Sequence, residues 1–279
     1  MTEQIPLSAP WLGEREEQLV VEALRSGQLS LGPLVDRFEH ALAEHIGAPF
    51  VAAVSSGTAG MHLGVRLAGV GPGDEVVTTP FSFVASANCI LYEGATPVFA
   101  DVDPASLNLD PDAVAAVITE RTKAIVVVDI FGYPAALDRF AELAEKHGLR
   151  LVEDACEALG ATEAGGRPVG SRGHPTVFAF YPNKQITTGE GGAVAVSGED
   201  DWQLLKSVSN QGRIDSGEWL THGHLGFNYR LDEVSAAIGL AQLERLDGLL
   251  AARARVAETY RDALAGIEGL DLQIGRAHV

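Results

Sequence analysis

Short apolar runs alternate with helical patterns between residues 50 and 197, and this alternation constrains the fold more than any other feature. The run from Ala124 to Val128 is apolar at every position, as expected for a strand that is buried on both faces of a parallel sheet. Parallel neighbours need long crossover connections, and the intervening segments have helical length and periodicity. The sequence therefore predicts a doubly wound α/β domain, with a mostly parallel sheet between helices.

The individual elements follow from these patterns. Strands are predicted at Phe50–Val54, Glu75–Thr79, Pro97–Asp101, Lys123–Asp129, Arg150–Glu153 and Pro175–Tyr181, and Gly191–Ser197 is a candidate for one more. Helices are predicted between the strands at Thr58–Leu67, Ser82–Tyr92, Pro111–Ile118 and Ala135–His147. Two helices precede them: Gly13–Ser26, and a segment in which Leu34, Phe38, Leu42 and Ile46 recur every fourth residue.

The C-terminal part has a different pattern. From Leu231 to Leu264 apolar residues trace one helical face, which predicts a long helix that leaves the large domain. We expect residues 1–235 to form a large domain with N-terminal helices, and residues 236–273 to begin a smaller, incomplete domain. The last six residues match one reading frame of a widely used sequencing adapter. We therefore expect a chain that is cut short at its C-terminus, with a non-native tail at residues 274–279.

Composition excludes several kinds of partner. The 279 residues include 38 acidic and 20 basic side chains, and a formal net charge of −18 disfavours nucleic acid and anionic membrane surfaces. Hydrophobic residues make up 46% of the chain, which allows a large core. Two cysteines, and no visible signal peptide or spanning apolar run, predict a cytoplasmic protein with reduced thiols. No metal site is predicted.

Lys184 lies in a loop that follows a predicted strand. Pro182 cannot continue a ladder, so the strand should end there and place Lys184 at the carboxyl end. Glycines at 189, 191 and 192 allow the backbone to turn tightly beside a ligand. A lysine displayed in this way could form an imine with an aldehyde cofactor. The alternative is an ordinary solvated lysine.

Other strand ends carry residues that suit a phosphorylated, planar ligand. Ser56, Gly57 and Thr58 open a helix after the first strand, where free backbone amides attract anions, although many such segments are only helix caps. Phe83 follows the next strand and could stack on a ring or pack in the core. Asp154 follows a buried strand and could pair with a pyridinium nitrogen or cap a helix. In open α/β sheets ligands collect at this edge, so together the residues predict a pyridoxal phosphate site.

The motifs around these residues resemble those of the DegT/DnrJ/StrS sugar aminotransferases, which are fold type I pyridoxal phosphate enzymes. The resemblance covers the chain from its N-terminus to about Leu246, and the Asn183 to Gly192 stretch is most similar to the perosamine synthase branch. The matching stretches are Ser55–Ala59, Thr79–Ala85, Glu153–Gly160, Asn183–Gly192 and Gly226–Arg230.

The resemblance implies a role for each matching residue. Lys184 is the implied Schiff-base lysine and proton shuttle, and Asp154 is the implied partner of the pyridine nitrogen. The implied cofactor contacts are Phe83 on the ring, Gly57 and Thr58 on the phosphate, Glu157 near the phenolic oxygen or the substrate, and Asn228 on the phosphate of a neighbouring subunit. Arg230 and Asn183 are candidates for substrate binding, and a structural salt bridge is the alternative for Arg230. Where the family commonly has a phosphate-binding serine, this chain has Ala179, and Ser56 is a candidate replacement.

The implied activity is transamination of a nucleotide-linked keto-deoxysugar by a homodimer with shared active sites. L-Glutamate is the implied amino donor, and surface polysaccharides or glycosylated metabolites are the implied products of the pathway. A non-catalytic sensor that binds pyridoxal phosphate is one alternative. A related sugar dehydratase is another, but that branch has histidine in place of Lys184. A simple nucleotide-binding Rossmann domain lacks support, because no Gly-x-Gly-x-x-Gly follows the first strand.

Overall fold

The sheet is the centre of the structure, a computed structural model that describes residues 6, 8–214, 220–270 and 272. Within these residues the sheet has seven strands in the order β1-β7-β6-β5-β4-β2-β3. Their bounds are β1 Phe50–Val54, β2 Glu75–Thr78, β3 Thr96–Phe99, β4 Thr122–Val128, β5 Arg150–Asp154, β6 Thr176–Ala179 and β7 Gly192–Val196. Strand β7 is antiparallel to β1 and β6, and the other pairs are parallel. The predicted α/β class and mostly parallel sheet are confirmed.

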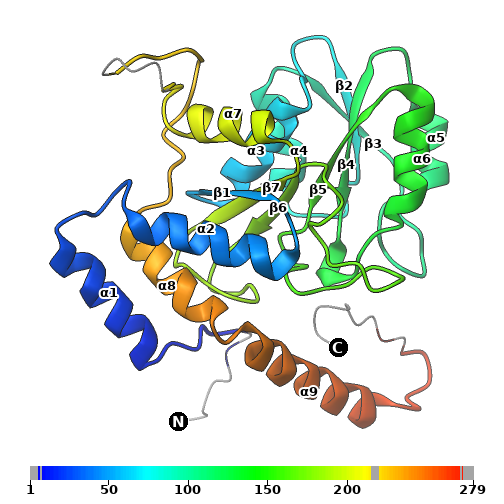
Figure 1. The fold of residues 1–279 in the computed structure, drawn as a ribbon. Helices are drawn as coiled ribbons and strands as arrows, with labels where there is room; N and C mark the ends of the chain where they lie inside the picture. The colour runs from blue at the N-terminus through cyan, green and yellow to red at the C-terminus, as the bar shows by residue number, and fades with distance from the viewer. Residues whose placement is uncertain (1–5, 7, 215–219, 271, 273–279) are drawn as a thin grey trace.

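Helices cover both faces of the sheet (Figure 1). They are α1 Glu14–Ser26, α2 Pro33–Ile46, α3 Gly57–Leu67, α4 Ala85–Tyr92, α5 Pro111–Val117, α6 Leu137–His147, α7 Glu199–Ser209, α8 Glu233–Leu243 and α9 Leu246–Leu264, with a short 3-10 turn, η1, at Ile130–Gly132. The buried side chains of α3, α4 and α7 pack on one face. Those of α2 and α8 pack on the opposite face near β1, β6 and β7, and those of α5 and α6 near β2 and β4.

Strand β4 illustrates why the sequence folds in this way. Every residue from Ala124 to Val128 is buried. Ala124 and Val126 pack with the core under α3 and α4, whereas Ile125 and Val127 pack with the core under α5 and α6. A strand that is covered on both faces has no position for a polar side chain, so its sequence is a continuous apolar run.

Two features differ from the sequence prediction. Helix α7 was not predicted, although Gly198 followed by Glu199, Asp200 and Asp201 is typical of a helix start. The predicted single helix after Leu231 is two helices, α8 and α9, which are separated at Glu244 and Arg245. The apolar periodicity continues across the break because Leu243 and Leu246 enter the same core.

The C-terminal predictions fall partly outside the described residues. Residues 274–279, for which a non-native tail is expected, are not among them. The expected domain boundary after residue 235 lies within α8, and the division into two domains stays a prediction. Among the described helices, none has both the length and the apolar character needed to cross a lipid bilayer.

Candidate active site

Three parallel strands deliver the candidate residues to one edge of the sheet. Strands β1, β5 and β6 run in the same direction, so their carboxyl ends share an edge. Asp154 is the last residue of β5, Ser56 caps the helix that follows β1, and Lys184 lies in the loop after β6. The fold therefore brings to one edge the lysine, the carboxylate and the helix start.

Glu157 holds the amine of Lys184. Lys184 Nζ donates to Glu157 Oε1 at 3.0 Å. The other carboxylate oxygen accepts from the backbone N–H of Phe131 at 3.2 Å, and the Gln185 side chain donates to the Glu157 carbonyl. Phe131 has φ 54°, a left-handed conformation that is uncommon for a phenylalanine. The backbone of η1 thus fixes the carboxylate that orients the lysine.

Asp154 is anchored by a serine that the sequence analysis missed. Asp154 is 6% exposed, and its Oδ2 accepts a hydrogen bond from Ser86 Oγ at 2.6 Å. Oδ1 accepts from the backbone N–H of Cys156 at 3.3 Å, and Ser82 Oγ lies 2.7 Å from Ser86 Oγ. The sequence signal for this contact was the spacing of Ser82 and Ser86, which lie four residues apart near the start of α4. These bonds hold the carboxylate and leave oxygen lone pairs for a further donor.

Cys156 lies among the charged groups of the site. Burial raises the pKa of its thiol, the negative charges of Asp154 and Glu157 raise it further, and the positive charge of Lys184 opposes them. A Cβ placed on Gly57 would lie 3.2 Å from Cys156 Sγ and 2.6 Å from Ala179 Cβ. The lysine, both carboxylates and the start of α3 therefore surround a single side chain.

The start of α3 offers free donors for an anion. Ser56 Oγ accepts from Ala59 N at 3.1 Å. The backbone N–H groups of Gly57 and Thr58 have no acceptor among the described residues, and both residues are partly exposed. Free amides at a helix N-terminus suit a phosphate group. The donor set therefore fits pyridoxal phosphate: amides for the phosphate, a carboxylate for the ring nitrogen and a primary amine for the aldehyde.

Phe83 lies close to this site in the chain but exposes its ring. The residue is 76% exposed, while its carbonyl accepts from Ser86 N at 3.1 Å. Phe83, in the turn before α4, is thus hydrogen-bonded to Ser86, the α4 serine that contacts Asp154. Ring stacking by Phe83 stays a prediction.

The remaining candidates lie on segments beside the strand ends. Asn228 forms an antiparallel bridge with Asn210, and Tyr229 O accepts from Ser55 N at 2.8 Å. Arg230 Nη1 donates to the amide oxygens of Asn210 at 2.9 Å and Gln211 at 2.8 Å. The alternative of a salt bridge for Arg230 finds no support, since these partners are neutral.

Asn183, the other candidate for substrate binding, precedes Lys184 in the loop after β6. Its side chain is exposed, and its carbonyl lies 3.4 Å from Arg253 Nη2. Arg253, which the sequence analysis did not single out, thus reaches this loop from α9.

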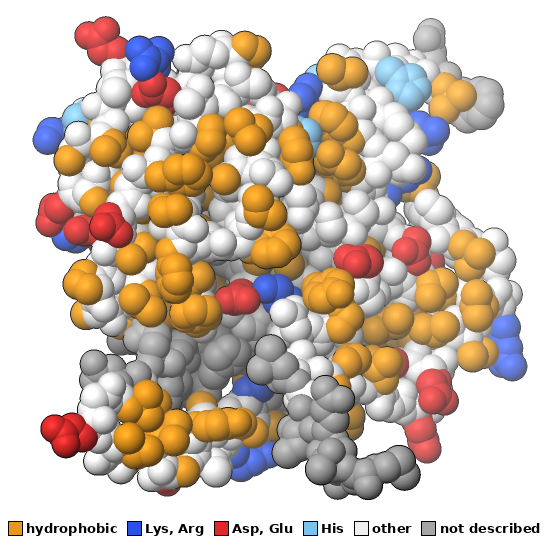
Figure 2. All heavy atoms as spheres, turned by 180° about the vertical axis from the view of Figure 1, so that it is seen from behind, with side chains coloured by type: hydrophobic (Ala, Val, Ile, Leu, Met, Phe, Trp, Pro, Cys, Tyr) orange, Lys and Arg blue, Asp and Glu red, His pale blue; other side chains and the backbone are white. Residues whose placement is uncertain are grey.

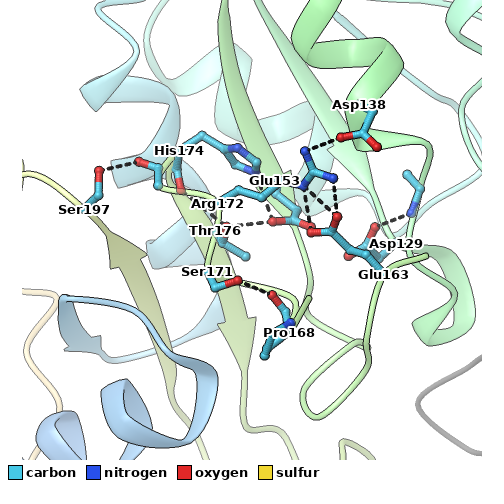
Figure 3. A network of polar contacts seen from close by, with 12 residues as sticks. Asp129, Asp138, Glu153, Glu163, Pro168, Ser171, Arg172, His174, Thr176 and Ser197 are labelled. Carbon is cyan, nitrogen blue, oxygen red and sulfur yellow. Dashed lines mark hydrogen bonds and ion pairs between the residues drawn. The ribbon is translucent and has the colours of Figure 1, made fainter. Parts of the chain in front are cut away.

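A buried acid pair lies directly behind Asp154. Asp129 and Glu153 are each 1% exposed, and Asp129 N donates to Asp154 O at 3.0 Å. His174 Nε2 lies 3.0 Å from Glu153 Oε2, which also accepts from Thr176 Oγ1 at 2.7 Å (Figure 3). Burial, followed by the charge of Glu153, raises the pKa of Asp129 well above its ordinary value. The raised pKa favours the protonated form of Asp129, which can donate to the neighbouring Glu153 carboxylate.

Family and structural comparisons show an aminotransferase that uses pyridoxal phosphate, with the architecture of a fold type I large domain. The chain belongs to the DegT/DnrJ/EryC1/StrS aminotransferase family, whose family model matches residues 10–277. The resemblance inferred from the sequence motifs is confirmed.

Individual relatives cover most of the chain. A GDP-perosamine synthase of Caulobacter vibrioides is 41% identical over 263 residues, which are 94% of this chain and 70% of that protein. The spore coat polysaccharide biosynthesis protein SpsC of Bacillus subtilis is 39% identical over 275 residues, 95% of this chain and 70% of that protein.

Solved structures agree with this assignment. The structure of 3-amino-5-hydroxybenzoic acid synthase has a TM-score of 0.93 at 36% identity, and the match covers 99% of this chain and 74% of that one. The sugar aminotransferase CalS13 from Micromonospora echinospora has a TM-score of 0.91 at 36% identity, covering 99% of this chain and 79% of that one.

Proposed function

We propose that the chain transfers an amino group from L-glutamate to the keto group of a nucleotide-linked deoxysugar, as a perosamine synthase does. The observation that carries this proposal is the 3.0 Å contact between Lys184 Nζ and Glu157 Oε1, at the same sheet edge as Asp154 and the free amides of α3. The sugar class is supported by two GDP-perosamine synthases, 41% and 38% identical to this chain.

Each residue has a physical task in this reaction. Bound pyridoxal phosphate supplies an electron sink for the negative charge that develops at the α-carbon of the donor. Lys184 would hold the cofactor through its aldehyde, and its amine would move the proton at the α-carbon of the donor. Asp154 would hold the proton on the ring nitrogen, and the backbone amides of Gly57 and Thr58 would donate to the phosphate. Glu157 accepts a hydrogen bond from the Lys184 amine and so keeps it directed toward the site.

A homodimer with shared active sites is part of this proposal. Hydrophobic side chains gather over large areas of the face drawn in Figure 2. Phe83, Tyr92 and Leu225 are among the exposed large hydrophobic residues, with Leu225 77% exposed. Large exposed apolar patches are typical of protein interfaces. We propose that Asn228 reaches the phosphate bound by the partner subunit, and that the enzyme works in the cytoplasm, where its two free cysteines stay reduced.

The alternative activities are not favoured. A dehydratase of the related branch would have histidine where this chain has Lys184. Two relatives are GDP-perosamine synthases and a structural neighbour is a sugar aminotransferase, which supports a catalytic role over a sensor.

The decisive experiment offers the holoenzyme L-glutamate and a panel of nucleotide-linked 3-keto and 4-keto sugars, with amino sugar and 2-oxoglutarate measured by mass spectrometry. We expect amino transfer to at least one acceptor. Lys184→Ala should abolish both the transfer and the absorption band of lysine-bound cofactor at about 420 nm, with the melting curve preserved. Turnover by Lys184→Ala, or a bound cofactor that no amino donor converts, would refute the proposal.

A further inference from the structure

Arg253 of α9 contacts the backbone of the lysine itself. Arg253 Nη2 donates to Lys184 O at 2.5 Å and lies 3.4 Å from Asn183 O. Lys184 N also donates to Tyr181 O at 2.9 Å and closes the turn Tyr181–Lys184. Two hydrogen bonds thus hold this turn: one within its own backbone, and one from a side chain about seventy residues further along the chain.

The charge of Arg253 is not used in an ion pair within the described part of the chain. Its guanidinium is partly buried, and burial lowers the pKa of Arg253. A cation removed from water without a carboxylate is costly, so the carbonyl contacts only partly offset the loss of hydration. Stability alone does not account for an arginine in this place.

Helix α9 has few other ties to the large domain. Leu246 is its buried residue, and Leu249 and Leu250 pack partly against the core. Beyond Leu250, Arg253 is the one described side chain of α9 with a hydrogen bond outside its own helix. A shift of α9 is therefore transmitted directly to the carbonyl of Lys184.

We propose that Arg253 is a positioning residue for Lys184: it fixes the backbone from which the lysine side chain leaves the loop, and couples that backbone to the orientation of α9. The proposal rests on the proposed role of Lys184 as the amine that bonds to the cofactor. A lysine side chain has four rotatable bonds, so the amine reaches Glu157 reproducibly only if the Lys184 backbone is held.

Three variants and a matched control test this role. Arg253→Ala removes the donor, Arg253→Gln keeps a neutral donor, and Arg253→Lys keeps the charge. Arg255→Ala is the control. Arg255 lies exposed on the same helix, and apart from helix backbone bonds its only described hydrogen bond is the one that its carbonyl accepts from Thr259 Oγ1 within α9. Melting curves verify that each variant is folded.

The first readout needs no cofactor. Hydrogen exchange followed by mass spectrometry on peptides spanning residues 181–190 reports the opening of the turn. We expect Arg253→Ala to raise exchange at Lys184 and Gln185 by about ten-fold, Arg253→Lys to restore part of the protection and Arg255→Ala to match wild type. Unchanged exchange in Arg253→Ala would overturn the proposal.

The second readout is the rate at which pyridoxal phosphate becomes fixed to Lys184 by borohydride reduction, located by peptide mapping. Arg253→Ala should slow this step and lower kcat by about ten-fold or more, while KM for the amino donor stays within about two-fold. A change confined to KM would make Arg253 a substrate contact and refute the positioning role. If the wild-type chain fixes no cofactor at Lys184, the proposed function fails, whereas the exchange experiment still decides whether Arg253 holds the turn.

Discussion

Replacing Asp129 by asparagine should stabilise the protein near neutral pH. Burial, and then the charge of Glu153, raises the pKa of Asp129, which favours its protonated form. Its Oδ1 accepts from Ala135 N at 2.8 Å, while Oδ2 and Glu153 Oε1 are buried without a hydrogen-bond donor among the described residues. A proton on Asp129 would supply that donor. An asparagine in this place can accept from Ala135 with its oxygen and donate to Glu153 with its amide nitrogen, so the variant makes both bonds without a bound proton.

The size of the effect follows from the proton balance. In the unfolded chain Asp129 ionises near its ordinary pKa of about 3.9, whereas the native carboxyl keeps its proton to a higher pH. The stability that Asp129 contributes is therefore complete below that ordinary value and is lost as pH rises through the window up to the raised pKa. The loss is about 1.4 kcal/mol per pH unit when the native state binds one extra proton. Burial raises the pKa of Glu153, but the hydrogen bond and charge of His174 and the hydrogen bond from Thr176 together lower it, so the ionised form of Glu153 is favoured.

Urea unfolding, followed by circular dichroism between about pH 5 and 7, measures the difference. The advantage of Asp129→Asn over wild type should grow by about 1.4 kcal/mol per pH unit. Asp129→Ala is the matched variant: it leaves Ala135 N and Glu153 Oε1 unpaired and should cost about 2–6 kcal/mol in total, at about 1–3 kcal/mol for each group. Equal pH slopes for wild type and Asp129→Asn would show that Asp129 is ionised, and would refute the reasoning.

Two further substitutions probe the proposed phosphate site at the start of α3, where the backbone amides of Gly57 and Thr58 have no acceptor among the described residues. Gly57→Ala places a methyl 2.6 Å from Ala179 Cβ, so the start of α3 must shift; we expect a loss of about 1–3 kcal/mol in urea unfolding and weaker cofactor binding by absorbance titration. An unchanged free energy of unfolding would contradict this expectation and show that the backbone around Gly57 shifts without cost. Ala179→Ser adds a hydroxyl beside the free amides of Gly57 and Thr58 and should tighten pyridoxal phosphate binding about five-fold, equivalent to about 1 kcal/mol. Equal affinities in the same titration would count against a phosphate at this position.

The sequence predicted what depends on strand order and strand ends. Lys184, Asp154 and the Ser56 to Thr58 segment each follow an apolar run, and parallel strands necessarily bring such positions to one edge. Ser86 and Arg253 were missed because their contacts join segments far apart in the chain, and a serine or arginine on a helix has no periodic signature for a distant partner. The break between α8 and α9 at Glu244 and Arg245 was also not predicted. The two helices pack into one core, so their apolar residues keep a common periodicity across the break.

Strand β7 is the last of the described strands along the chain, yet it lies between β1, the first of them, and β6. Its first residue, Gly192, is so close to the start of α3 that a Cβ there would lie 2.8 Å from Gly57 N. The start of α3 and the loop that carries Lys184 therefore acquire their mutual spacing only when β7 pairs with β1, and we expect this long-range pairing to be a slow step in folding. Cofactor capture thus reports a completed sheet, and excess vitamin B6 aldehyde during refolding should trap the finished fold by mass action and leave earlier species unliganded.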